Sequence, residues 1–153
     1  RDGMIGRTMK VLLQRVTTAR VEVAGETVGA IDAGLLALVG VERHDDDAMV
    51  ARMAERVAGY RMFSDDRGRM NRDVREHGGA VLLVSQFTLA ADTRKGRRPS
   101  FSGAAAPADG ERLYRALAEA LRGTGLTVAT GRFGADMRVS LTNDGPVTFM
   151  LEM

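Results

Sequence analysis

The residues best placed to do chemistry form two short runs, Ser85-Gln86-Phe87-Thr88 and Gly145-Pro146. The first run puts three polar side chains around one aromatic ring, directly after the apolar stretch 81–84, which is typical of a strand that ends at a cleft. Ser85 or Thr88 could be a nucleophile, but no neighbouring base in the sequence would activate either hydroxyl. Backbone N–H groups of the run could instead hold an oxyanion, which needs no base. A polar strand end that only caps the sheet is the simpler alternative.

Gly145-Pro146 lies between two strand-like stretches, in a chain with only three prolines. Because proline cannot donate a hydrogen bond to a sheet, it must lie at an edge, a turn or a bulge. The plain interpretation is an Asp-Gly-Pro turn between two strands. An X-Pro bond can also be cis, which turns two successive carbonyls to the same side, and the sequence leaves the isomer open.

Most of the usual catalytic groups are missing. The chain has no cysteine, which excludes disulfides and thiolate chemistry and fits a reducing compartment. Of its two histidines, His44 precedes three aspartates that suit the start of a helix better than a metal site, and His77 is expected in a loop. Neither a nucleophile elbow nor a phosphate loop nor a dinucleotide fingerprint is present. We therefore expect no metal and no cofactor.

A basic loop, 93–99, carries Arg94, Lys95, Arg97 and Arg98 between glycine and proline. Such a loop suits phosphate contacts, which supply affinity rather than sequence reading. The net charge of the chain is only +2, so no global basic field indicates nucleic acid. A solvated surface loop is the equally plain alternative.

The elements that must position these residues follow from hydrophobic periodicity. Helical spacing predicts a helix over 49–60, capped by Asp45 or Asp46, and a second over 107–123. Apolar or alternating runs predict strands over 10–16, 21–23, 27–31, 35–41, 80–84, 126–130, 137–141 and 147–151. The long connection 90–106 exceeds what a simple link requires, which favours a functional role.

The length of 153 residues and a hydrophobic content of 44% predict one domain with a real core. We expect an α/β fold, a curved, barrel-like mixed sheet covered by two main helices. The domain is expected to span 9–153, with 1–8 as a leader or a remnant of expression. Because no apolar run approaches about 20 residues, we expect a soluble, cytoplasmic protein without a membrane span.

Several runs, taken in order, make the chain similar to the D-aminoacyl-tRNA deacylases. They are Gln14-Arg15-Val16, Gly34-Leu35-Leu36, Ser85-Gln86-Phe87-Thr88-Leu89, Ala91 to Phe101, Gly134-Ala135-Asp136-Met137 and Asn143 to Thr148. The resemblance extends from Met9 to the C-terminus. The departures, Ala90 in place of a commoner aromatic residue and Arg69 in place of a lysine, lie outside the motifs.

The resemblance implies hydrolysis of the ester that joins a D-amino acid, or glycine mischarged on tRNA-Ala, to tRNA, as chiral proofreading in translation quality control. It implies a homodimer in which a cis Gly145-Pro146 enters the partner's pocket and rejects L-amino acids. Ser85, Gln86, Phe87 and Thr88 would then line the pocket. Phe133 and Met137 would lie near the adenosine, and Arg15 would support the Gly-Pro segment. The basic loop is our candidate for contacts with tRNA.

This activity is compatible with the missing catalytic groups. An aminoacyl ester beside a free 2′-OH is already activated, so positioning, oxyanion donors and that hydroxyl can supply the rate. Two alternatives stay open: Thr88 as a covalent nucleophile, and a non-catalytic tRNA- or RNA-binding module.

Overall fold

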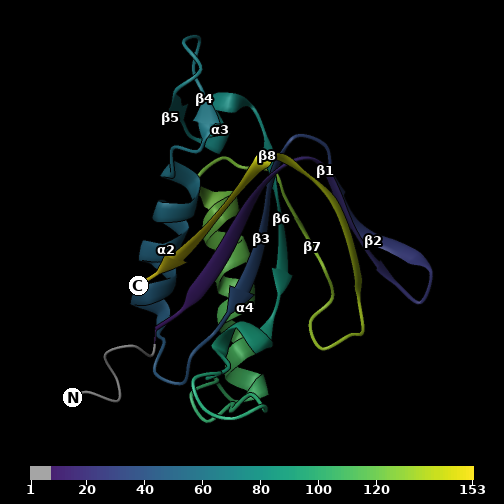
Figure 1. Cartoon of the computed structure of the whole chain (residues 1–153), viewed down its shortest axis with the longest axis vertical. Coiled ribbons are helices and arrows are strands. Elements are labelled where there is room, and N and C mark those ends of the chain that lie inside the picture. Colours follow the sequence, from purple (N-terminus) through teal and green to yellow (C-terminus); the bar gives the residue numbers. More distant parts are fainter. Residues whose placement is uncertain (1–7) are drawn as a thin grey trace.

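The computed structural model describes residues 8–153, so the predicted leader lies almost wholly outside the described residues. The strands of the main sheet are β1 (Lys10–Val23), β2 (Glu26–Ile31), β3 (Gly34–Gly40), β6 (Ala80–Ser85), β7 (Val128–Thr130) and β8 (Arg138–Glu152). The other elements are α2 (Asp47–Gly59), β4 (Phe63–Ser64), β5 (Met70–Arg72), α3 (Val74–His77), the 3₁₀ turn η1 (Phe87–Ala90) and α4 (Pro107–Gly123). Figure 1 shows their arrangement.

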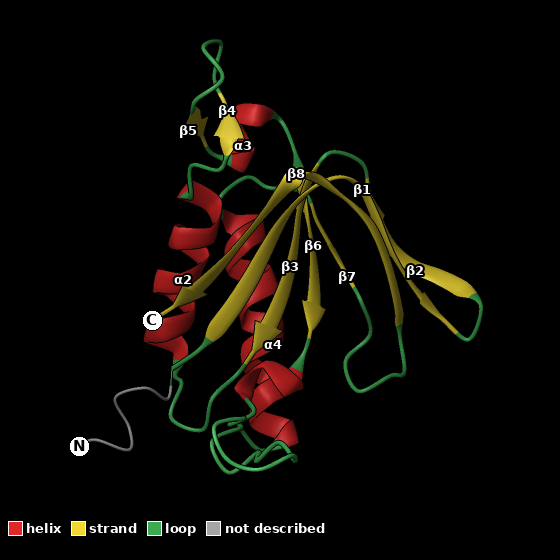
Figure 2. Cartoon of the chain, viewed as in Figure 1, coloured by secondary structure: helices red, strands yellow, loops and turns green. Residues whose placement is uncertain are grey.

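The main sheet is mixed and strongly curved (Figure 2). The long strand β1 pairs antiparallel with β8 on one side. On the other side it pairs antiparallel first with β3 and then with β2, while β3, β6 and β7 run parallel. The sheet curls until β2 meets β7, where a Cβ on Gly29 would lie 2.3 Å from the carbonyl oxygen of Thr130. Only glycine permits that approach. The predicted barrel-like α/β fold is confirmed.

Both faces of the central strands are buried, as the continuous apolar runs predict. On β6, Val81 and Leu83 pack in the core shared with the helices, and Leu82 and Val84 pack in the core inside the curved sheet. The helix-side core is closed by the buried stripes of α2 (Val50, Met53, Ala54, Val57, Ala58) and α4 (Gly110, Leu113, Tyr114, Leu117, Ala118, Leu121).

The two long helices begin where the sequence predicts. Asp46 is the N-cap of α2, its carboxylate accepting from the Met49 N–H at 2.9 Å, and Pro107 opens α4. The short helix α3 was missed, although Asp73 and Glu76 form the reciprocal capping box that signals a helix start. His77 therefore ends a helix, where it stacks on Phe63, and does not lie in a loop.

Two pairs of predicted strands are each one continuous strand. β1 runs unbroken through Thr17 and Thr18, because pairing with β8 and then β2 continues past these exposed residues. β8 likewise runs through Gly145-Pro146, so the plain turn interpretation is wrong. Between the pairs Gln14–Thr148 and Val16–Asn143, one residue of β1 faces four of β8. The Gly-Pro segment is thus a bulge opposite Arg15.

Candidate active site

A pocket of about 330 Å³ opens where the parallel strands β3 and β6 end. Four residues predicted from the sequence line it together: Ser85, Phe87, Phe133 and Met137. The remaining lining comes from Val39, Val41, Ala105, Pro107, Gly110, Gly134 and Ala135. Carboxyl ends of parallel strands are the usual place for ligand sites in α/β folds. We call this cavity the strand-end pocket.

The turn η1 is held tightly against the end of β3. The Gln86 N–H donates to the Val39 carbonyl at 2.7 Å, which extends the β3–β6 pairing to the start of η1. A Cβ on Gly40 would lie 2.8 Å from Leu89 Cβ and 3.4 Å from the Gln86 carbonyl oxygen. Gly40 therefore permits the approach that fixes η1 beside the pocket. This glycine was missed in the sequence, because nothing local indicates what packs on it.

The polar side chains of η1 are paired with each other. The Gln86 amide donates to the Thr88 hydroxyl oxygen, and neither residue lines the strand-end pocket. A neutral amide cannot accept a proton, so this partner does not activate Thr88 as a nucleophile. Within residues 8–153, the backbone N–H groups of Phe87 and Thr88 have no acceptor, as expected for the first turn of a helix. These two donors are what η1 offers to a developing negative charge.

Tyr114 of α4 fixes the wall of the pocket formed by Phe133. The two rings pack with centroids 6.0 Å apart, and the Tyr114 hydroxyl donates to the Leu83 carbonyl at 2.6 Å. Burial raises the pKa of Tyr114 to about 12, so the hydroxyl stays a donor at physiological pH. Next to it, Gly131 leaves room for the Met137 thioether, since a Cβ there would lie 2.8 Å from the sulfur.

Gly145-Pro146 lies near the opposite end of the sheet from Ser85. Arg15, which faces the bulge, pairs with Leu35, and Leu35 pairs with Val81. Ser85 is four residues further along β6, about 13 Å in the strand direction. The Gly145-Pro146 bond is cis. Within one chain, then, the structure does not bring the Gly-Pro segment to the strand-end pocket.

Arg15 ties the bulge to the body of the protein. Its Nε donates to the Asp144 carbonyl at 3.0 Å and its Nη1 to the Met62 carbonyl at 2.9 Å. An ion pair with the Asp144 carboxylate, 3.6 Å from Nε, adds to these bonds. The guanidinium thus joins β8 to the segment that follows α2.

The basic loop is exposed, but its first cation is engaged. Arg94 donates to both carboxylate oxygens of Asp92, at 2.9 and 2.8 Å, and this pairing raises the pKa of the guanidinium. Lys95, Arg97 and Arg98 are exposed to solvent. The base of the loop is closed by two backbone hydrogen bonds between Asp92 and Ser100, and Phe101 beyond it packs against Phe87 with ring centroids 5.1 Å apart.

Known protein sequences are similar to this chain along almost the whole domain. The sequence model of a family described as "D-Tyr-tRNA(Tyr) deacylase" matches residues 12–152. Proteins named D-aminoacyl-tRNA deacylase from Alcanivorax borkumensis and Ectopseudomonas mendocina are 64% and 61% identical to this chain, and each alignment covers 95% of the chain and 100% of the relative.

Solved structures with the same fold are also known. "c-Myc DNA Unwinding Element Binding Protein" superposes with a TM-score of 0.89 at 37% identity, covering 94% of this chain and 98% of that one. A "probable eukaryotic D-amino acid tRNA deacylase" superposes with a TM-score of 0.84 at 18% identity, covering 95% of this chain and 100% of that one, which supports the fold alone.

No helix in the part of the chain that the structure describes is both long and apolar enough to cross a membrane.

Proposed function

The chain belongs to the D-Tyr-tRNA(Tyr) deacylase family, and we propose that it hydrolyses the ester of D-aminoacyl-tRNA to free tRNA and a D-amino acid. As a deacylase it is a hydrolase acting on carboxylic ester bonds. The observation that carries this proposal is the family match across residues 12–152, together with the convergence of four motif residues on one pocket. Its place of action would be the cytoplasm, where aminoacyl-tRNA is used.

The strand-end pocket would take the terminal adenosine and its aminoacyl group. Phe133 and Met137 would contact the adenosine, and Ser85 and Phe87 would flank the ester. Support comes from the composition of the pocket, whose lining is mainly apolar and includes the polar side chain of Ser85. The exposed cations of the basic loop would contact tRNA phosphates, with Arg94 contributing least because Asp92 already binds it.

Water would attack the ester carbonyl carbon, and the carbonyl electrons would move onto the oxygen. The backbone N–H groups of Phe87 and Thr88 would stabilise that oxyanion, since neither has another acceptor among the described residues. When the oxyanion collapses, the bond to the ribose oxygen breaks. That oxygen takes the proton that the attacking water gives up, relayed through the neighbouring 2′-OH. Each oxyanion donor is worth about 10² to 10³ in rate.

Chiral selection would come from Gly145-Pro146 of a second copy of the chain. The position of this segment, far along the sheet from Ser85 in its own chain, supports a role in a partner's pocket. There it would leave space for hydrogen but not for an L side chain. Exclusion of a side chain cannot reject glycine, so glycyl-tRNA mischarged on tRNA-Ala would be a substrate too.

Deacylation of D-Tyr-tRNA and L-Tyr-tRNA tests the function directly. We expect turnover of the D form and of glycyl-tRNA, and none of the L form. Equal binding of the D and L forms without turnover would instead indicate the non-catalytic RNA-binding module. Clearance of D-Tyr-tRNA with glycyl-tRNA left intact would rule out selection by steric exclusion alone.

Thr88→Ala separates the oxyanion mechanism from covalent catalysis. The substitution keeps the backbone N–H, so we expect most turnover to remain. Abolished turnover with intact binding, and an acyl group trapped on Thr88 in the unsubstituted enzyme, would identify Thr88 as the nucleophile.

A further inference from the structure

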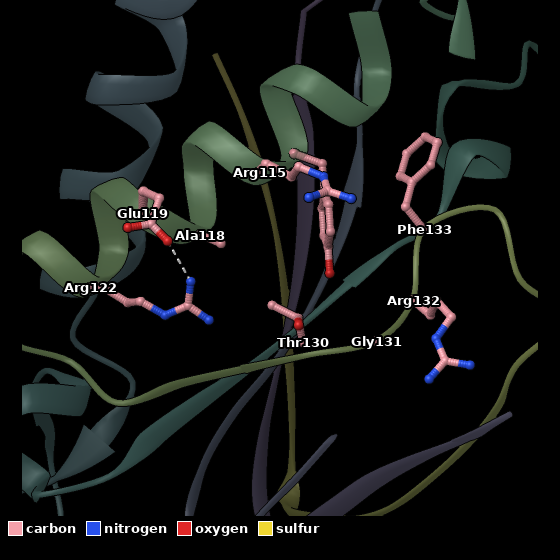
Figure 3. Close-up of a pocket in the computed structure, with 9 residues that line it drawn as sticks. Arg115, Ala118, Glu119, Arg122, Thr130, Gly131, Arg132 and Phe133 are labelled. Atoms are coloured by element: carbon pink, nitrogen blue, oxygen red, sulfur yellow. Dashed lines mark hydrogen bonds and ion pairs between the residues drawn. The ribbon is translucent and has the colours of Figure 1, made fainter. Parts of the chain in front are cut away.

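A second pocket, of about 410 Å³, lies between α4 and the segment that follows β7 (Figure 3). Three arginines line it, Arg115 and Arg122 from the helix and Arg132 from the connection to β8. We call it the arginine pocket. Arg115 and Arg122 are seven residues apart, so they project from the same face of α4, two turns from each other. Neither the sequence motifs nor the proposed chemistry uses any of these three residues.

The arginine pocket is electropositive. Its lining holds three guanidinium groups against one carboxylate, Glu119, an excess of two positive charges. Glu111 lies outside the lining but accepts a hydrogen bond from Arg115 at 2.7 Å. When its carboxylate is counted too, the excess is one positive charge. A concave site with this balance favours an anion.

Two of the arginines are held in place and the third is free to bind. Arg122 donates through Nη1 to Glu119 at 2.7 Å (Figure 3). Its Nη2 donates to the Val128 carbonyl at 3.1 Å, so both terminal nitrogens of its guanidinium are engaged. Arg132 is exposed, and among residues 8–153 its side chain has no hydrogen-bond or ion-pair partner. A planar guanidinium with all its donors available is suited to bidentate binding of phosphate.

The arginine pocket adjoins the strand-end pocket through Phe133, which lines both. Thr130, Gly131 and Arg132 come directly before Phe133 and line the arginine pocket. This connection is fixed to β6, because the Gly131 N–H donates to the Leu83 carbonyl at 3.1 Å, the same oxygen that Tyr114 binds. The segment that carries Arg132 and Phe133 is therefore anchored to β6 between the two pockets.

We propose that the arginine pocket binds a phosphodiester group of the single-stranded 3′ end of the tRNA, while the terminal adenosine occupies the strand-end pocket. The inference rests on the proposed function, since it takes the position of the adenosine from it. The tRNA backbone then follows a path along α4 and past Phe133, separate from the basic loop. Arg132 makes the direct contact, and Arg115 and Arg122 supply the surrounding positive field.

The test compares two D-tyrosyl esters that differ in phosphate: D-Tyr-tRNA and 2′(3′)-O-D-tyrosyl-adenosine, which has none. Arg132→Gln should raise KM for D-Tyr-tRNA about tenfold, as for the loss of a charge-assisted hydrogen bond, and leave KM for the adenosine ester unchanged. It should also lower the slope of log(kcat/KM) against log salt by about 0.7, the value for one phosphate contact on a single strand. Arg112→Gln is the matched control, because Arg112 lies on the same helix but pairs with Asp47 of α2.

Two outcomes for Arg132→Gln would contradict a phosphate contact at this residue. Equal effects of Arg132→Gln on both esters, or equal effects of Arg132→Gln and Arg112→Gln on D-Tyr-tRNA, would overturn the phosphate site. Failure of the unsubstituted protein to hydrolyse either ester would instead refute the proposed function. Lys95→Gln, tested alongside, reports the basic loop separately.

Discussion

At the scale of single residues, the candidate site depends on groups that hold backbone in place rather than on groups that titrate. Arg15 is the clearest case, because its guanidinium binds two carbonyls from segments far apart in the sequence, those of Asp144 and Met62. The motif Gln14-Arg15-Val16 could be recognised from the sequence, but the partners of Arg15 could not. Nothing local indicates which carbonyls a half-buried arginine will reach.

Arg15→Met should destabilise the protein, because it leaves two carbonyls without their charged donor. We expect a loss of about 1–3 kcal/mol in the free energy of unfolding, measured with urea. Arg20→Met, on the same strand, is the control. Arg20 is exposed and its pairing with Glu22 spans 3.8 Å, so less than about 1 kcal/mol should be lost. Equal losses would mean that the bonds of Arg15 add nothing beyond a surface charge.

Gly145→Ala should displace the bulge, because a Cβ there would lie 2.7 Å from Val147 Cγ2 and 3.1 Å from Arg15 Nη2. If the bulge closes a substrate pocket, a shift of about 1 Å should lower kcat/KM for D-Tyr-tRNA by about a hundredfold. The control is Gly25→Ala, at the β1–β2 turn. Gly25 also has a positive φ, of 83°, but nothing lies within 4 Å of its Cβ position. Deacylation by Gly145→Ala at the rate of Gly25→Ala would contradict the role of the bulge.

At the scale of elements, the sequence predicts which helices and buried strands form better than it predicts how far each strand continues. The two long helices and the buried strands follow from periodicity, because each buries a face that its own pattern defines. The continuity of β1 and β8 does not, since an exposed residue such as Thr18 is held in the strand by Thr142, a partner more than a hundred residues away. Long-range pairing overrides local preference there.

Gly40→Ala tests how β3 positions η1. The added Cβ would lie 2.8 Å from Leu89 Cβ, so η1 must move and carry the Phe87 and Thr88 N–H groups with it. We expect kcat to fall at least tenfold, because a displaced donor loses part of the factor of about 10² to 10³ that one oxyanion donor is worth, and stability to fall by about 1–3 kcal/mol. Gly123→Ala, in the last turn of α4 with nothing within 4 Å, should instead leave activity unchanged and raise stability slightly. Unchanged kcat in Gly40→Ala would separate η1 from the chemistry.

At the scale of the whole molecule, one chain holds two parts of the proposed site that it cannot bring together. The strand-end pocket lies at the carboxyl end of β6, and the Gly-Pro bulge lies level with the beginning of that strand. The residue types of both parts can be recognised in the sequence. Their separation is set by the register of four strands, β8, β1, β3 and β6, which no local pattern fixes.

Mixed subunits test whether the site is shared between two copies. In a dimer of Gly40→Ala with Gly145→Ala, one of the two sites would combine an intact pocket with an intact bulge, and the other would have both defects. Random association of equal amounts makes half of the dimers mixed, so activity should recover to about a quarter of that of the unsubstituted enzyme. The measurement is D-Tyr-tRNA deacylation before and after the two variants are unfolded and refolded together. Each variant refolded alone is the control. Because a site contained in one chain would keep one defect in every subunit, recovery would then be absent, and the bulge would have to act within its own chain.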